Sequence, residues 1–146
     1  MTVTADFIEA VRDFSMMIDR KYPSKPLLKL IGDRYQLNRQ QRDTISRGIS
    51  SRQLSKLRKN KRIESLAFPE KRTLHVDFYN VFYTLLNYLN GKPLFISSDT
   101  FVRDSGAAYG KRIANPAEQE RIIHLIYQFI MSHSIQQVIF YLDSPI

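Results

Sequence analysis

The sequence predicts an α/β protein in which an N-terminal helical module, residues 1–67, precedes a domain with a short parallel sheet, residues 73–146. Apolar residues recur at the three-to-four spacing of helices before Phe68-Pro69, and short apolar runs alternate with helical patterns after it. The excess of positive charge is confined to the first part. Residues 1–72 carry 17 basic and 8 acidic residues, whereas residues 73–146 carry 5 and 6. A basic part joined to a near-neutral part predicts two modules with different roles.

Residues that favour helix ends mark three helices in the first fifty residues. Thr4, Ser24 and Asn38 each precede an apolar pattern with helical spacing, and their side chains can accept a hydrogen bond from the first turn. Tyr22-Pro23 ends the first helix because proline lacks the amide donor that a helix interior needs. The third helix has a weak point at Arg47-Gly48, and a cation-rich helical stretch follows it.

Strand and helix patterns alternate after residue 72. The expected order is a strand over 74–76 that ends at Asp77, a helix over 81–89, a short apolar run over 94–96, a helix that begins at Asn115-Pro116 and a strand over 138–142 that is buried on both faces. The sixteen residues 97–112 are expected to form a functional loop or to contain a short helix, since irregular loops of this length are uncommon. Strands joined by helical crossovers predict a parallel sheet.

An aspartate follows each of the two main strands. Asp77 and Asp143 stand directly after the apolar runs 74–76 and 138–142. Because the carboxyl ends of neighbouring parallel strands meet at one edge of the sheet, both carboxylates can reach one Mg²⁺ or Mn²⁺ ion. Such an ion activates water and neutralises the charge that develops on a phosphodiester. Asn80, one helical step past Asp77, can orient a ligand. The alternative is that these aspartates cap helices or form turns.

The run from Arg52 to Arg62 contains six basic residues among eleven and no acidic one. Such a block repels itself and suits the regularly charged backbone of a nucleic acid. The alternatives are a solvated helix face, a flexible connector or a localisation signal. The expected phosphate contacts extend into the preceding helix and are made by Arg39, Arg42, Arg47, Arg52, Lys56, Arg58, Lys59 and Arg62.

Composition excludes several other functions. Without cysteine, the chain has no disulfide framework, no thiolate metal site and no cysteine nucleophile. This composition fits a reducing cytoplasm, which is the expected location. No stretch approaches the ~20 apolar residues of a membrane span, so no membrane is expected as a partner. His124 and His133 are nine residues apart, a spacing that disfavours joint zinc ligation.

Several short motifs in a fixed order resemble one known family. They are Arg20-Lys21-Tyr22-Pro23, Leu30 to Leu37, Gln41-Arg42 with Arg47-Gly48, Val76 to Val81, Phe101 to Asp104, and Leu142-Asp143-Ser144-Pro145. Together they are similar to the prokaryotic family catalogued as domain of unknown function 434, in which a helical module precedes a PIN-like domain. The resemblance covers nearly the whole chain.

The resemblance implies a partial, three-layer PIN-like domain and the chemistry of the PIN and NYN nucleases. In that superfamily, acids at the carboxyl edge of the sheet bind Mg²⁺ or Mn²⁺ for phosphodiester hydrolysis. Asp77, Asn80 and Asp143 match the catalytic positions. Asp99 and Asp104 match acids of the family's own loop and are further candidate metal ligands.

Two departures from the family pattern bear on catalysis. Phe78 stands beside the first acid where the family usually has glycine, and a bulky side chain there crowds the approach of metal or phosphate. Family members also continue past Asp143-Ser144-Pro145 with further strands and helices, so the chain looks truncated. The sheet is therefore expected to be incomplete, which predicts a homo-oligomer or a partner chain that completes it.

These observations lead to two main functional hypotheses. The first is a nucleic-acid-associated PIN-like protein that acts as a Mg- or Mn-dependent ribonuclease, with RNA favoured over DNA as the ligand. The second is a non-catalytic nucleic-acid-binding protein, in which residues 27–47 form a helix-turn-helix-like reader and the PIN-like part is degenerate. A third is an interaction scaffold whose charge serves solubility alone. The sequence leaves open whether the protein is an enzyme.

Overall fold

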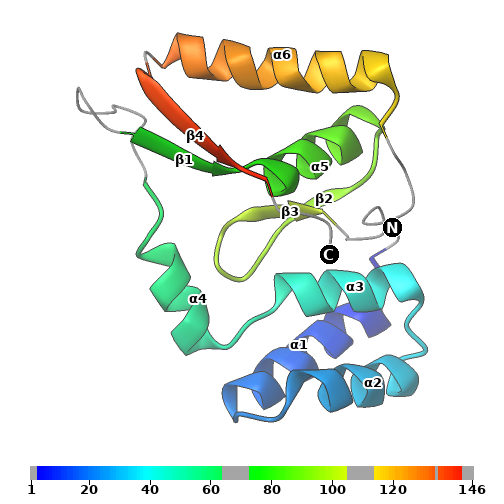
Figure 1. Ribbon diagram of the computed structural model, residues 1–146. Coiled ribbons are helices and arrows are strands. Elements are labelled where there is room, and N and C mark those ends of the chain that lie inside the picture. Colours follow the sequence, from blue (N-terminus) through cyan, green and yellow to red (C-terminus); the bar gives the residue numbers. More distant parts are fainter. Residues whose placement is uncertain (1–2, 64–72, 105–113, 134, 143–146) are drawn as a thin grey trace. The chain divides into compact units, whose positions relative to one another are not determined.

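A computed structural model shows how the chain folds (Figure 1). It describes residues 3–63, 73–104, 114–133 and 135–142. The chain divides into two compact units, each assembled from two separate stretches of sequence. Unit 1 consists of Met1–Arg62 and Lys92–Ala108, and unit 2 of Ile63–Gly91 and Tyr109–Ile146. The predicted α/β class is confirmed, because helices and a short parallel sheet are both present in the described residues.

Unit 1 begins with four helices: α1 (Ala5–Asp19), α2 (Ser24–Arg34), α3 (Arg39–Gly48) and α4 (Arg52–Lys59). Thr4 caps α1 and Asn38 caps α3 through their side chains, as predicted. Helix α2 differs, since Pro23 occupies its cap position and Ser24 is already helical. The expected weak point after Arg47 is confirmed, because α3 ends at Gly48 and α4 starts four residues later.

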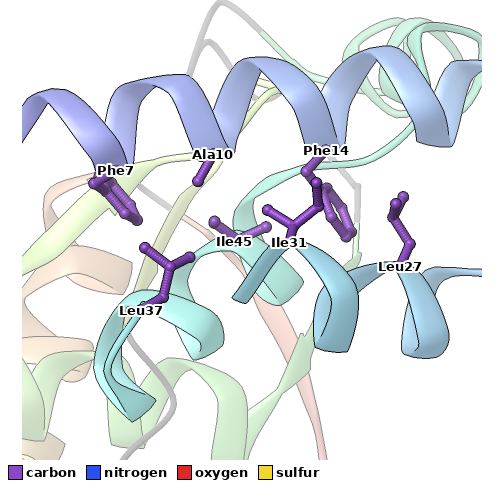
Figure 2. Packing of buried hydrophobic residues seen from close by; sticks show 7 residues of the cluster. All are labelled: Phe7, Ala10, Phe14, Leu27, Ile31, Leu37 and Ile45. Atoms are coloured by element: carbon purple, nitrogen blue, oxygen red, sulfur yellow. The ribbon is translucent and has the colours of Figure 1, made fainter. Parts of the chain in front are cut away.

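One apolar cluster holds α1, α2 and α3 together (Figure 2). Its buried side chains come from all three helices and from the turn between α2 and α3, and they are Phe7, Ala10, Phe14, Leu27, Ile31, Leu37 and Ile45. Because the apolar residues of each helix lie on one face, burying the three faces against one another removes them from water together. This cluster is the core of unit 1.

A four-residue turn over 35–38 joins α2 to α3. Leu37 enters the core, and its carbonyl accepts a hydrogen bond from Arg42 Nε at 2.9 Å. The same guanidinium pairs with Asp33 at 3.0 Å. It also lies so close to Gly32 that any side chain at that position would overlap it. Arg42 therefore fastens the turn, and its charge is balanced within the fold.

A β-hairpin from a distant part of the sequence completes unit 1. β2 (Leu94–Ile96) pairs antiparallel with β3 (Val102–Asp104). The expected irregular loop is confirmed for residues 97–101, which form the turn of this hairpin, and is wrong for residues 102–104, which form β3; residues 105–113 lie outside the described part of the chain. Asp99 explains the difference, because its carboxylate accepts from the Phe101 amide at 3.3 Å and organises a tight turn. The sequence pattern assigns this segment to the C-terminal domain, whereas in the structure it packs with the helices.

The described residues of unit 2 form a two-stranded parallel sheet and two helices (Figure 1). In chain order they are β1 (Thr73–Asp77), α5 (Phe78–Leu89), α6 (Pro116–Ser132) and β4 (Gln137–Tyr141). β1 and β4 are neighbours in register, from Thr73 opposite Gln137 to Asp77 opposite Tyr141. The predicted parallel pairing is confirmed. Asn115 caps α6 and Pro116 begins it, also as predicted.

Helices α5 and α6 pack together over one face of this sheet. Phe82 and Leu86 of α5 and Ile122 of α6 form the buried core of unit 2. Phe78, the first residue of α5, meets Phe140 of β4 edge to face, with ring centroids 5.8 Å apart. Aromatic contacts of this kind contribute about 0.5–1.5 kcal/mol beyond the area they bury. The strands and helices of unit 2 are therefore joined through the side of β4 that carries Phe140.

Within the described residues of unit 2, no helix covers the opposite face of the sheet. His75 and Tyr141 lie there, because side chains alternate along a strand. Both are exposed, and His75 Nδ1 is 2.7 Å from the Tyr141 hydroxyl. Ile139 on the same face is 39% exposed. The expectation that β4 is buried on both faces is therefore wrong within the described residues.

Ile45 lies at the centre of the core of unit 1 and is 0% exposed. We expect Ile45→Ala to lower the free energy of unfolding by about 2–5 kcal/mol, because it removes buried methyl groups and leaves a cavity. Urea denaturation followed by circular dichroism measures the loss. Leu30→Ala is the matched control: Leu30 is 60% exposed on α2, and its truncation should change stability by no more than about 0.5 kcal/mol. Equal losses in both variants would contradict this assignment of the core.

Candidate functional site

Asp77 ends β1 at the carboxyl edge of the sheet and also caps α5. Its carboxylate accepts hydrogen bonds from the backbone amide of Asn80, at 3.3 Å, and from the side-chain amide of Asn80. Both residues are exposed. The helix-capping role that the sequence allowed for Asp77 is therefore observed. The Asp77 carboxylate accepts hydrogen bonds from the first turn of α5. Because the residue is exposed, the carboxylate is also accessible to a ligand.

The parallel register brings the carboxyl end of β4 beside Asp77. Tyr141 stands directly opposite Asp77. Asp143 follows Tyr141 by two residues and lies outside the described part of the chain. Among the described residues, no three histidine, aspartate or glutamate side chains group as a metal site. The structure thus supplies the neighbouring strand ends on which the magnesium or manganese hypothesis depends.

Asp99 belongs to unit 1, and it is engaged by the protein's own cations. The residue is 1% exposed. Its carboxylate accepts hydrogen bonds from Arg103 Nη2 at 2.7 Å, from Arg58 Nη1 at 3.3 Å and from the Ser97 hydroxyl. A buried carboxylate needs such partners, because leaving it unpaired away from water is costly. This environment favours a structural role for Asp99 over the metal ligation considered from the sequence.

Asp104, the other candidate ligand of the loop, is also 1% exposed and paired. Arg47 Nη2 of α3 lies 3.4 Å from its carboxylate. Asp104 ends β3, so this ion pair fixes the hairpin to α3. We refer to Asp99 and Asp104 with Arg47, Arg58 and Arg103 as the ionic anchor.

Hydrogen bonds lower the pKa of Asp99. Burial acts first and in the opposite direction, since it would raise the pKa by disfavouring the charged form. The Ser97 hydroxyl, the Arg103 guanidinium and the Phe101 amide all stabilise the charged form, and together they outweigh burial. Asp99 is therefore ionised at neutral pH, and its charge attracts the arginines of the ionic anchor.

Serine side chains attach the hairpin to α3 and α4 beside the ionic anchor. The Ser98 amide donates to the Gly48 carbonyl at 2.8 Å. The Ser98 hydroxyl accepts from the Ser50 amide at 3.1 Å and lies 2.9 Å from the Ser55 hydroxyl. The Phe95 ring packs on Gly48, where a Cβ atom would come within 2.7 Å of it. Gly48 therefore permits the close approach of the hairpin.

Helix α4 presents one stripe of side chains to the hairpin. Ser55 contacts Ser98, and Arg58 reaches Asp99 one turn further along. Arg62, one turn beyond Arg58, donates to the Thr100 hydroxyl at 3.3 Å. Ser55 and Arg58 are three residues apart, a spacing that places side chains on one helix face, and Arg62 follows just past the end of the helix at Lys59. The hairpin thus holds α4 by hydrogen bonds and ion pairs, since α4 has no buried residue.

Every residue of α4 except Ser55 is exposed. Lys56 and Lys59, three residues apart, form a cationic stripe, and Lys61 follows in the same basic run. Within the described residues none of these lysines has a carboxylate partner. Leu54 and Leu57 lie on a different side and are 40% and 56% exposed.

Most of the cations predicted to contact phosphate are engaged within unit 1. The pairs are Arg39 with Asp43, Arg42 with Asp33, Arg47 with Asp104, Arg52 with Asp19, Arg58 with Asp99 and Arg62 with Thr100. The first pair spans 3.8 Å with the arginine 87% exposed, so it contributes little. Lys56 and Lys59 complete the predicted set. The structure thus separates Arg42, Arg47 and Arg58, which hold the fold, from Lys56 and Lys59, which face water; Arg52, which like Arg39 is paired, is 91% exposed.

Sequence reasoning missed the ionic anchor because its members are far apart along the chain. Arg58 and Asp99 are separated by 41 residues. One local signal was present: the run Ser97 to Thr100 combines residues that favour turns and side-chain hydrogen bonds to the backbone. That signal indicates a tight turn, but it does not indicate which arginines neutralise the aspartate.

The fold and the charge distribution define an α/β protein whose helical unit is strongly basic. Residues 68–146 match a family described as a domain of unknown function (DUF5616), and the chain belongs to this family. Residues 6–61 match the family described as a protein of unknown function (DUF434), which bears out the resemblance noted in the helical module.

An uncharacterized protein of Methanocaldococcus jannaschii is similar to most of the chain. The two sequences are 28% identical over 138 residues. The match covers 94% of this chain and 65% of the length of that relative. No solved structure matches the chain. Among the described helices, none is both long enough and apolar enough to cross a bilayer.

The lowered pKa of Asp99 predicts a pH dependence of stability. Because the folded state holds its proton less tightly than the unfolded state, Asp99 contributes stability at neutral pH that is lost as the pH falls below about 4. Asp99→Asn should lower the free energy of unfolding at pH 7 by roughly 1–3 kcal/mol. The difference from the parent protein should shrink toward pH 2.

Urea titrations at several pH values measure this difference. Asp6→Asn, which changes an exposed carboxylate outside the ionic anchor, is the control. A stability gap between parent and Asp99→Asn that stays constant from pH 7 to pH 2 would show that the charge of Asp99 does not support the fold.

Proposed function

We propose that the protein binds nucleic acid through Lys56 and Lys59 of α4 and through Lys61, which follows the helix. The observation that carries this proposal is the separation of cations on α4. Arg58 is held by Asp99 of the hairpin and Arg52 pairs with Asp19 of α1, while Lys56, Lys59 and Lys61 have no ion pair within the described residues. Lysines without carboxylate partners can neutralise phosphates and release the counterions condensed on a nucleic acid.

The hairpin supports this role by ordering the helix in advance. An isolated helix of eight residues is not stable in water. Here Ser98 and Asp99 hold α4 through Ser55 and Arg58. Because the helix is already in place, binding does not have to supply the cost of ordering it. The expected ligand is RNA, by the resemblance of residues 76–81 to PIN-like nucleases.

A base-reading role for α3 receives less support. Helices α2 and α3 with their four-residue turn have the connectivity of a helix-turn-helix. However, Arg42 fastens the turn and Arg47 pairs with buried Asp104. With these side chains engaged inside unit 1, the supported mode is contact with the phosphate backbone, which carries no sequence information directly.

Paired lysine substitutions test the interface. Lys56→Ala with Lys59→Ala should weaken binding to labelled single-stranded RNA and reduce the slope of log affinity against log salt by about 0.7 for each lost contact. Fluorescence anisotropy at several salt concentrations measures both quantities, with single-stranded DNA alongside.

The matched control is Lys25→Ala with Lys29→Ala, which removes two exposed lysines from α2. It leaves net charge equal to that of the α4 variant, so the two proteins differ only in where charge is lost. Equal weakening by both pairs would show that overall charge, and not α4, attracts the nucleic acid.

A second candidate function is metal-dependent phosphodiester hydrolysis in a PIN-like unit 2. The observation that favours it is the register of β1 and β4, which sets Asp77 opposite Tyr141, two residues before Asp143. Asp77 and Asp143 would hold the ion, and Asn80 would orient Asp77. Exposed carboxylate oxygens are suitable ligands for Mg²⁺ or Mn²⁺, and a bound ion would supply activated water and charge neutralisation.

Asp77→Asn tests this second candidate without removing the helix cap, since asparagine caps helices as well as aspartate does. We expect the variant to lose Mg²⁺- or Mn²⁺-dependent cleavage of labelled RNA at least 100-fold while it keeps RNA affinity. Gel analysis of products over time measures cleavage. Asp6→Asn serves as the control. Cleavage that survives unchanged in Asp77→Asn would exclude this site and leave RNA binding as the supported function.

A further inference from the structure

Helix α4 buries little apolar surface against the rest of unit 1. It spans eight residues, and none of them is buried. Its two leucines, Leu54 and Leu57, are 40% and 56% exposed and take no part in the apolar core of the unit. Because burial of an apolar face supplies most of the stability of a packed helix, α4 is held chiefly by polar contacts.

The polar contacts gather where α4 meets the hairpin tip, residues 97–101. The Ser55 hydroxyl lies 2.9 Å from the Ser98 hydroxyl, and Arg58 donates to Asp99 at 3.3 Å. The Arg58 side chain is nevertheless 44% exposed, and that of Arg52, at the start of α4, is 91% exposed in its own ion pair. Water and salt screen ion pairs whose arginine is exposed to this extent. These contacts therefore place α4 on the hairpin but bind it only weakly.

The hairpin tip keeps its shape through contacts of its own. Thr100 has a φ of 69°, a conformation that is rare for a β-branched residue and costs free energy. Such strain persists only where neighbouring contacts impose it. Here the Thr100 amide donates to the Ser97 carbonyl at 2.9 Å, and the Ser97 hydroxyl donates to the Phe101 carbonyl at 2.8 Å. The tip is therefore formed within the hairpin and offers α4 a preformed docking surface.

The rest of unit 1 keeps its own partners when α4 leaves the hairpin. Without Arg58, the Asp99 carboxylate still accepts from Arg103 at 2.7 Å. The hairpin stays attached to α3, because Arg47 pairs with Asp104 independently of α4. The apolar core comes from α1, α2, α3 and the turn between the last two. Loss of α4 is therefore a local opening that leaves no buried charge unpaired.

We infer that α4 is a docking switch: it leaves and rejoins the hairpin while the rest of unit 1 stays folded, and the docked helix is the form that binds RNA. This inference rests on the proposed binding of RNA by α4. Away from the hairpin, eight residues do not sustain a helix, so Lys56 and Lys59 lose their fixed spacing of one turn. RNA would then have to supply the cost of ordering the segment.

The docking equilibrium sets the affinity for RNA. The apparent dissociation constant is that of the docked protein divided by the docked fraction, so contacts in the hairpin tip control binding without touching the ligand. Ser98 and Asp99 are thereby positioning residues for the lysines of α4. The coupling is reciprocal: RNA that prefers the docked helix must also slow its opening.

A pair of cysteines tests the switch in the full chain, which has no cysteine of its own. The Ser55 and Ser98 hydroxyls are 2.9 Å apart, so Ser55→Cys with Ser98→Cys allows one disulfide that holds α4 on the hairpin. When reduced, this variant lacks both hydroxyls and should bind labelled single-stranded RNA about fivefold or more weakly than the parent. Oxidation should restore the affinity to within about twofold of the parent. Fluorescence anisotropy with and without reductant measures both.

Ser98→Cys alone is the matched control, because it loses the same hydroxyl contact but cannot form the intrachain disulfide. It should bind RNA weakly under both conditions. Hydrogen exchange on the parent protein tests the opening without RNA. The amides of residues 55–60, hydrogen-bonded in α4, should exchange about tenfold or more faster than the core-facing amides of α1 and α3. Added RNA should slow the exchange of residues 55–60.

Equal RNA affinity of the oxidised and reduced double variant, with a parent that binds RNA, would overturn the switch. Amides of α4 that exchange as slowly as those of the core would overturn it too, since opening would then require the unfolding of all of unit 1. A parent that binds no RNA would overturn the proposed function together with the role of docking in binding. The exchange rates would in that case still decide whether α4 opens locally.

Discussion

The ionised carboxylate of Asp99, held out of water, is the constraint on which unit 1 depends. A buried charge is tolerated only when hydrogen bonds and opposite charges replace the water it has lost. Arg103 supplies one such partner from within the hairpin, and Arg58 supplies another from α4. The carboxylate also accepts from the Phe101 amide and so shapes the hairpin turn. One side chain thereby defines a turn and binds together segments 41 residues apart.

The same constraint decides which cations remain for a ligand. Arginine suits a buried carboxylate because its planar guanidinium donates several hydrogen bonds and is weakly hydrated, whereas the compact ammonium of lysine keeps its water. Unit 1 follows this difference: Arg47 and Arg58 pair with buried aspartates, while Lys56 and Lys59 stay in solvent. Within one basic run, Arg58 therefore serves the fold, while Lys56 and Lys59 on the same helix stay exposed.

Unit 2 depends on apolar packing instead of a buried charge. Its core joins α5 to α6, and the contact of Phe78 with Phe140 carries that packing to β4. Phe78 follows Asp77 directly, and its ring packs against Phe140 of the sheet. Only one face of the sheet is covered in the described residues, although parallel strands are ordinarily covered on both.

The sequence by itself determined the features that arise from neighbouring residues. Thr4, Asn38 and Asn115 cap helices where their side chains predicted it, and the apolar runs near residues 74–76 and 138–142 pair as parallel strands. Asp77 was placed correctly at a strand end, since a strand followed by a helix is also a local pattern. Only the tertiary structure decided that the hairpin packs with the N-terminal helices and that most of the predicted phosphate-binding arginines serve the fold. Ion pairs depend on which charged side chains lie close together after the chain has folded, and local sequence periodicity does not predict these long-range contacts.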